Sequence, residues 1–262
     1  MSGLRAALAT EWLKARRSRV PAITAAGFSL APLVGGLFML VLKDPERARS
    51  MGLVGAKARL MGTAADWPTY LGLLTQATAI GGVVVFGIAA VWVFGREFSE
   101  RTAKDLLALP TSRAAIVGAK FVVLGAWFAA LVAMVVGLGL GVGWLVGLPG
   151  WSAGTVLRSS AEVGVAGALT AGVVTPFALA ASWGRGYLAP VGVLFLTLFA
   201  SQILAAAGWG AWFPWSVPAL YSGAAGSDAR DLPAASYLTV ALTALAGMAS
   251  TAAWWRLADH DR

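Results

Sequence analysis

Few side chains in this sequence have the types and spacing needed for covalent chemistry. The segment Gly150-Trp-Ser-Ala-Gly154 has the G-x-S-x-G spelling of a hydrolase nucleophile elbow. A nucleophilic serine needs a base within hydrogen-bond reach, and the single histidine, His260, lies near the end of the chain. The topology argued below places Ser152 and His260 on opposite sides of a membrane. We therefore interpret the segment as the end of a glycine-rich loop.

Nucleotide, metal and nucleic-acid chemistry are also disfavoured. Gly118-Ala-Lys120 and Gly55-Ala-Lys57 lack the G-x-x-x-x-G-K-[ST] phosphate cradle, so any ATP must be hydrolysed by a partner chain. The chain has no cysteine, one histidine and no carboxylate cluster at ligand spacing, so we expect no metal site and no cofactor on this chain. The net charge of +8 fits the positive-inside rule and anionic lipid better than nucleic acid.

An ionisable residue interrupts one apolar run. Glu162 stands about two turns inside it, with Arg158 one turn earlier. An ionisable group inside a membrane is a candidate functional site, but an i, i+4 pair that neutralises itself is an equally simple interpretation. Three other polar residues could line a cavity with Glu162 or form hydrogen bonds between helices: Gln76, Gln202 and Thr175. Pro176 should kink this span.

The composition indicates the class of protein that carries these residues. With 58% hydrophobic and 12% charged residues and a mean hydropathy of +0.75, the chain is far more apolar than a soluble domain. We predict an all-α polytopic membrane protein with a single transmembrane domain over residues 1–262. Its six transmembrane helices are predicted at 20–42, 70–95, 114–146, 156–183, 187–207 and 234–255.

The distribution of lysine and arginine predicts the orientation. Residues 1–19 form a basic amphipathic helix on the membrane surface, with Leu4, Leu8 and Trp12 four residues apart. The positive-inside rule then places both termini in the cytoplasm and the protein in the plasma membrane. Lys120 should snorkel toward the cytoplasm. The segments 43–69 and 208–233 should be external, the second as a tryptophan-rich interfacial or re-entrant element.

The longest polar interval between two apolar runs is 96–113, REFSERTAKDLLALPTSR. It is too charged for hydrocarbon, and its apolar residues can form one stripe on a short helix that Thr102 would cap and Pro110 would end. We predict a cytoplasmic amphipathic helix between spans two and three. The apolar residues of this stripe are Phe98, Leu106, Leu107 and Leu109.

This interval, from Gly95 through Arg113 and with Lys120 after it, resembles the signature of type-2 ABC exporter permeases. The resemblance implies an N-terminal elbow helix at 1–19 and a coupling helix that docks on an ATP-binding subunit. It also implies a second permease, identical or related, with ATP and Mg bound by the partner subunits. It further implies that two groups of residues contact the ATP-binding subunit. The charged contacts would come from Glu97, Glu100, Arg101, Lys104 and Asp105, and the apolar contacts from Leu106, Leu107 and Leu109.

The resemblance implies export of a drug, an antimicrobial peptide or a lipid-like cargo. Two alternatives remain at this point. An ion-coupled secondary transporter would bind its coupling ion near Glu162 and need no ATPase, and a membrane scaffold or sensor partner would transport nothing. The sequence leaves open the cargo, the direction of transport and whether the two permeases are identical.

Overall fold

The computed structural model describes residues 2–44, 64–107, 111–224 and 232–257, and these residues form helices and connecting turns without a strand. Six helical segments are long and apolar enough to cross a membrane, which confirms the predicted number. One of them is broken into two helices. The segments are α2 (Val20–Lys43), α5 (Trp67–Ser99), α7 (Arg113–Val146), α8 with α9 (Ala153–Val173 and Pro176–Trp183), α10 (Leu188–Ala206) and α12 (Ala234–Leu257).

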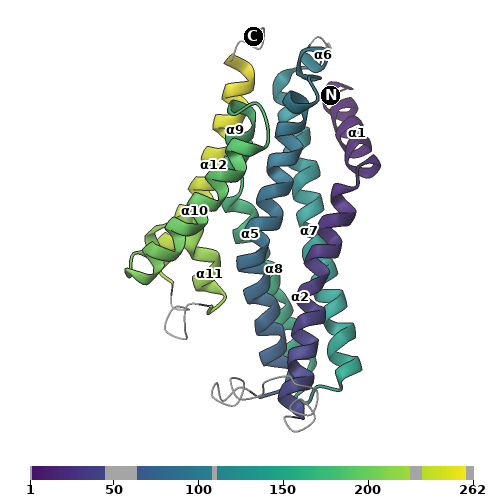
Figure 1. Ribbon diagram of the computed structural model, residues 1–262, viewed down its shortest axis with the longest axis vertical. Helices are drawn as coiled ribbons and strands as arrows, with labels where there is room; N and C mark the ends of the chain where they lie inside the picture. Colours follow the sequence, from purple (N-terminus) through teal and green to yellow (C-terminus); the bar gives the residue numbers. More distant parts are fainter. Residues whose placement is uncertain (1, 45–63, 108–110, 225–231, 258–262) are drawn as a thin grey trace.

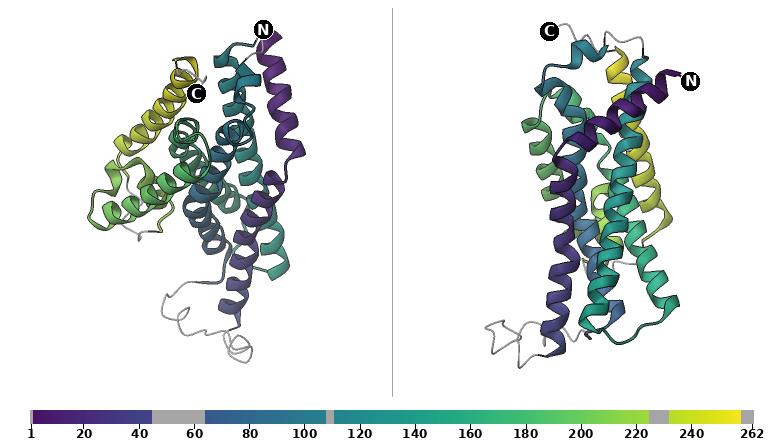
Figure 2. Two further views of the ribbon diagram at one scale, coloured as in Figure 1. Left: turned by 45° about the horizontal axis from the view of Figure 1, so that its top comes forward. Right: turned by 90° about the vertical axis from the view of Figure 1, so that its right-hand side faces the viewer.

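The helices form a long bundle with a second group of helices leaning against it (Figure 1). Both termini and the short helix α6 (Ala103–Leu107) lie at the same end of the molecule (Figure 1). Helix α1 (Ser2–Arg17) lies at that end too and packs against α7, as the side view in Figure 2 shows. We call it the terminal end of the bundle.

Helix α5 is the centre of the bundle and its most deeply buried span. It contacts α2, α7, α8 and α9. Its Phe86 ring stacks on Phe128 of α7 with centroids 4.2 Å apart. Helix α7 has Gly143 where the Trp67 ring of α5 occupies the space that a Cβ atom would need. This glycine therefore allows the close approach of the two helices.

Side-chain caps define where several helices begin. Asp66 accepts a hydrogen bond from Thr69 N at 3.0 Å to start α5, and Ser112 accepts from Ala115 N at 3.3 Å to start α7. Ser152 accepts from Thr155 N at 3.1 Å to start α8. The serine of the G-x-S-x-G segment is thus a helix cap, in agreement with its interpretation as a loop end. His260 lies outside the described residues.

The fourth span is broken where the sequence predicts a kink. Helix α8 ends at Val173 and α9 begins at Pro176, which has no N–H to continue the helical hydrogen bonds. The Thr175 hydroxyl donates to Gly172 O at 3.0 Å and to Ala244 O of α12 at 3.1 Å. The break is therefore joined to α12.

The two segments predicted as external differ in how much of each is described. Most of 43–69 lies outside the described residues. In 208–233 the chain forms two turns of 3-10 helix, η1 (Gly210–Trp212) and η2 (Pro214–Ser216), and the short helix α11 (Val217–Tyr221). Such short elements agree with the prediction that this segment does not span.

Candidate functional site

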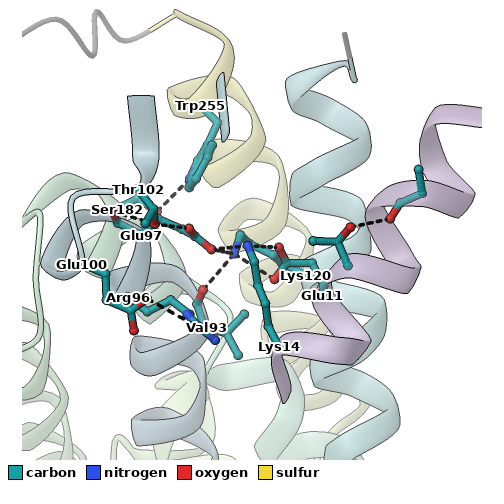
Figure 3. Close-up of polar contacts among 12 residues, drawn as sticks. Glu11, Lys14, Val93, Arg96, Glu97, Glu100, Thr102, Lys120, Ser182 and Trp255 are labelled. Atoms are coloured by element: carbon teal, nitrogen blue, oxygen red, sulfur yellow. Dashed lines mark hydrogen bonds and ion pairs between the residues drawn. The ribbon is translucent and has the colours of Figure 1, made fainter. Parts of the chain in front are cut away.

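Four charged side chains from three helices meet inside the terminal end of the bundle (Figure 3). We call these residues the charge network: Glu11 and Lys14 of α1, Glu97 in the last turn of α5, and Lys120 of α7. The exposed fraction is 0% for Lys120, 2% for Glu97 and 5% for Glu11. Charges buried to this degree are rare unless they are paired.

The pattern of residues on α1 explains how Glu11 reaches the interior. Ala7, Glu11 and Ala15 are four residues apart, so they lie on one face of the helix, and all three are buried. The small alanines let α1 approach α7 closely. The same geometry leaves Leu4 and Trp12 exposed, at 45% and 50%, on the side that we predict to face the membrane surface.

The Lys120 ammonium is fully satisfied. Its Nζ donates to Glu11 Oε2 at 3.0 Å, to Glu97 Oε1 at 2.9 Å and to the backbone oxygen of Val93 at 3.1 Å. A lysine ammonium has three donors, so no donor is left over. The prediction that Lys120 snorkels to the cytoplasm is therefore wrong, because carboxylates inside the protein replace the water that snorkelling would have reached.

Lys14 and Thr102 complete the arrangement. Lys14 Nζ donates to Glu11 Oε1 at 2.8 Å and to Glu97 Oε1 at 2.7 Å, and the Thr102 hydroxyl donates to Glu97 Oε2 at 2.7 Å. Burial acts to lower the pKa of Lys14, but the two carboxylates outweigh it and raise that pKa above the ordinary lysine value. Two cations and two anions make the charge network neutral.

Removing a group from such a network is costly. Deleting one partner of a buried ion pair typically costs about 3–5 kcal/mol, because the other charge is left uncompensated. Nothing in the charge network has the geometry of a nucleophile and its base. What the network can do is hold α1, α5 and α7 at a fixed spacing next to α6.

The structure locates the residues of the polar interval differently from the prediction. Helix α5 continues to Ser99, so Glu97 belongs to the end of a span and faces inward. In this structure Glu97 is therefore not on a surface that a partner could contact. The Thr102 hydroxyl donates to Glu97 instead of capping the next helix, although the Thr102 backbone oxygen accepts from Leu106 N at 3.0 Å.

Helix α6 presents a charged outer face. Leu106 is 9% exposed and belongs to the core of this chain, so it does not offer its side chain to a partner in this structure. The remaining apolar contacts predicted there, the Leu107 side chain and Leu109, lie outside what the structure describes. The charged residues of the turn and of α6 are exposed: Glu100, Arg101, Lys104 and Asp105.

Glu162 lies at a second, separate site. A cavity of about 110 Å³ is lined by Glu162 of α8, Thr75 of α5, and Tyr221 and Ser222 at the end of α11. Among the described residues Glu162 has no ion pair or hydrogen bond, and Arg158 is exposed four residues away. The self-neutralising pair is therefore not formed.

The other predicted pathway residues do not gather around Glu162. Gln76 is half-buried and Gln202 is exposed, and neither lines this cavity. Thr175 is used in the α8–α9 break, where it bonds to backbone oxygens. Of the four residues, only Glu162 faces the cavity.

Sequence reasoning missed Glu11 and Lys14 as site residues. The available signal was a single acidic residue in an otherwise basic helix, flanked at a spacing of four by Ala7 and Ala15. A polar residue between two small residues on one helical face indicates close contact with another helix.

Comparison with known proteins gives two matches. Residues 7–201 match the model of a family described as ABC-2 family transporter protein. The chain is 27% identical over 179 residues to the bacitracin transport permease protein of Bacillus licheniformis, covering 68% of this chain and 85% of that protein. No solved structure matches this chain. The matched residues include every member of the charge network.

Proposed function

Because this chain belongs to the ABC-2 family of transporter permeases, we propose that it forms half of the membrane pathway of an ATP-driven exporter. It is a multi-pass membrane component that lacks an ATPase domain. ATP and Mg are bound by a separate ATP-binding subunit, and a second permease, identical or related, completes the pathway. The terminal end of the bundle faces the cytoplasm, in the orientation that the positive-inside rule favours.

The observation that carries this proposal is the connection between α6 and the charge network. Thr102 immediately precedes α6, its backbone oxygen accepts from Leu106 N, and its hydroxyl donates to Glu97. Glu97 in turn accepts from Lys14 of α1 and Lys120 of α7. A displacement of α6 therefore acts on three helices at once. This is the property that a helix needs if it is to transmit the motion of an ATPase.

The docking surface that we propose is charged. Glu100, Arg101, Lys104 and Asp105 are exposed and can form ion pairs with an ATP-binding subunit. The buried Leu106 holds α6 on its own bundle instead of filling a groove of the partner. With exposed ion pairs to the partner and Leu106 anchored in its own bundle, α6 could bind and release the ATP-binding subunit without unfolding.

The proposed cargo is a drug, an antimicrobial peptide or a lipid-like molecule. Bacitracin appears in the name of the relative, and cargo of that class fits the short segments between the spans of this sequence. The cavity at Glu162 measures about 110 Å³, whereas one water molecule occupies about 30 Å³ in the liquid. Such a cavity is too small for a peptide, so we place the cargo path between the two permeases.

The unpaired Glu162 carboxylate supports one other candidate function. An ion-coupled secondary transporter needs an ionisable group in a span with access to a small cavity, and Glu162 has both. In that case transport would respond to a proton gradient, and Glu162→Gln would abolish the response. Under the ABC-2 proposal, transport instead stops when ATP is withdrawn and continues when the proton gradient is dissipated.

Co-purification from native membranes tests the main proposal. The tagged chain should bring down an ATP-binding subunit, identified by mass spectrometry. The double variant Lys104→Glu/Asp105→Lys exchanges two adjacent exposed charges and leaves the net charge of the chain unchanged. It should lose most of that subunit and of the associated ATPase activity. The control Arg158→Glu changes an exposed charge on α8 and should retain both.

Two results would contradict different parts of the proposal: the exporter assignment or the docking surface. Absence of any ATP-binding subunit with the wild-type chain in mild detergent would contradict the exporter assignment. Full recovery of the subunit with Lys104→Glu/Asp105→Lys would instead show that docking uses another surface, while the exporter itself stands.

A further inference from the structure

A pocket beside the charge network has the chemistry of a phosphate site. It measures about 380 Å³ and lies between α1 and the last turns of α5. We propose that it binds the headgroup of an anionic phospholipid. Its wall combines cations with apolar side chains: Lys14, Arg17, Arg96 and Glu100 supply charge, and Leu13 and Trp92 supply apolar surface.

The charges of the pocket leave a positive surplus. Lys14 is already compensated by Glu11 and Glu97. Arg96 has one carboxylate nearby, Glu100 at 3.3 Å, whose side chain is half exposed and therefore screened by solvent. Arg17 has no ion pair within the described residues. One cation in the pocket is thus without a counter-ion.

Arg96 also has donors to spare. Its side chain is only 16% exposed, its guanidinium lies 4.8 Å from the centre of the Trp92 ring, and its Nε and Nη1 atoms are buried with no hydrogen-bond acceptor among the described residues. Leaving buried donors unpaired is unfavourable. A phosphate oxygen is an acceptor that a guanidinium binds strongly, through a charge-assisted hydrogen bond.

The position of the pocket favours a lipid over a soluble anion. Arg17 ends α1 and the first span begins at Val20, so the pocket lies at the level where α1 meets the membrane. Trp92 is the kind of side chain that occupies the headgroup level of a bilayer. Leu13 lines the pocket and is 47% exposed, so it gives a lipid apolar surface beside the headgroup. Basic pockets between helices on the cytoplasmic side of a membrane are known sites for acidic headgroups.

The pocket adjoins the charge network directly. Lys14 belongs to both, and Arg96 precedes Glu97 in the same helical turn. A bound headgroup would hold α1 against α5 from the membrane side, while the network holds it against α7 from within. This inference concerns lipid binding and does not depend on the cargo or on an ATPase.

Titration of the purified full-length chain with short-chain lipids tests the proposal. In a neutral detergent, binding of phosphatidylglycerol and phosphatidylcholine is read by native mass spectrometry. We expect the wild type to prefer phosphatidylglycerol by at least about fivefold, and Arg17→Gln to remove about fivefold in affinity. Arg96→Gln should reduce affinity at least as much. Thermal unfolding shows whether each variant is folded. If Arg96→Gln does not fold, Arg17→Gln still tests the proposal, because Arg17 is exposed and its substitution should leave the fold intact.

The matched control is Arg5→Gln, which removes the same charge from the same helix about three turns away from the pocket. It should leave phosphatidylglycerol affinity unchanged. Equal losses for Arg5→Gln and Arg17→Gln would indicate diffuse attraction and overturn the proposal, as would equal affinity for the two lipids. Displacement of phosphatidylglycerol by millimolar inorganic phosphate would assign the pocket to a free anion, which also overturns the lipid assignment.

Discussion

Glu97 and Glu162 are both glutamates in spanning helices, yet the protein treats them in opposite ways. Glu97 is 2% exposed and accepts from Lys14, Lys120 and Thr102. Glu162 faces a cavity and has no ion pair or hydrogen bond within the described residues. Each has an arginine nearby in sequence, so local sequence does not make the difference. The difference comes from side chains of other helices. They hold Glu97 in place between α1, α5 and α7, whereas none of those described binds Glu162, which stays available to a ligand.

The largest loss of stability is expected when Lys120, the central cation around Glu97, is removed. Lys120→Met leaves Glu11 and Glu97 buried with Lys14 alone, and we expect a loss of about 3–5 kcal/mol in the free energy of unfolding. Denaturant unfolding in detergent measures it. A loss below about 1 kcal/mol would mean that water or a rearranged Lys14 replaces the missing ammonium.

Adding Glu97→Gln to Lys120→Met should cost less unfolding free energy than the two single losses together. In Glu97→Gln/Lys120→Met a buried charge of each sign is gone, so the double variant should be more stable than the sum of the single losses predicts, by about 1–3 kcal/mol. The same unfolding experiment gives this coupling energy. Strict additivity would show that the two residues do not stabilise each other, contrary to their 2.9 Å contact.

A smaller effect is expected for the hydroxyl that joins α6 to the network. Thr102→Val keeps the shape of the side chain and removes one hydrogen bond to a carboxylate, with an expected loss of about 1.5–3 kcal/mol. The matched control is Thr197→Val on α10, where the hydroxyl donates only to Val193 O of its own helix. Its change should stay within about 0.5 kcal/mol. Equal losses for Thr102→Val and Thr197→Val would show that the hydrogen bond to Glu97 does not cause the loss at Thr102.

The smallest effect on stability is expected at Glu162. Glu162→Gln removes a charge that has no partner to leave behind, so unfolding should change by less than about 0.5 kcal/mol. With Arg158→Gln added, the two changes should be additive within about 0.5 kcal/mol, because the residues form no pair. A coupling energy well above that value would restore the ion pair that the sequence suggested and would end the contrast with Glu97.

The hydropathy of the sequence was sufficient to predict the order and approximate position of the spans. The six apolar runs, the polar interval at 96–113 and the break before Pro176 were all predictable because each depends on neighbours in sequence. The boundary of α5 was not, since its last turn carries charge and is stabilised by residues of α1 and α7. A charged turn can remain helical and buried when its partners come from elsewhere in the chain.

The candidate site was only partly predictable for the same reason. Glu97 was predicted as a partner contact and Lys120 as a snorkelling residue, and their buried partners on α1 were not predicted, because a spacing of four on α1 does not specify which helix covers that face. For Arg158 and Glu162 the spacing allows a pair, yet Glu162 lines a cavity with residues at the end of α11, and Arg158 is exposed. Tertiary contacts decide between outcomes that the local pattern permits equally.

The sequence separation within the charge network has a consequence for biosynthesis. Lys120 follows Glu11 by 109 residues, so at about 5–20 residues per second the ribosome delivers the second partner roughly 5–20 s after the first. Until Glu97 is made, 83 residues after Lys14, α1 has only its own Glu11 and Lys14. The charge network can therefore join α1 to α7 only after the start of the third span has been synthesised.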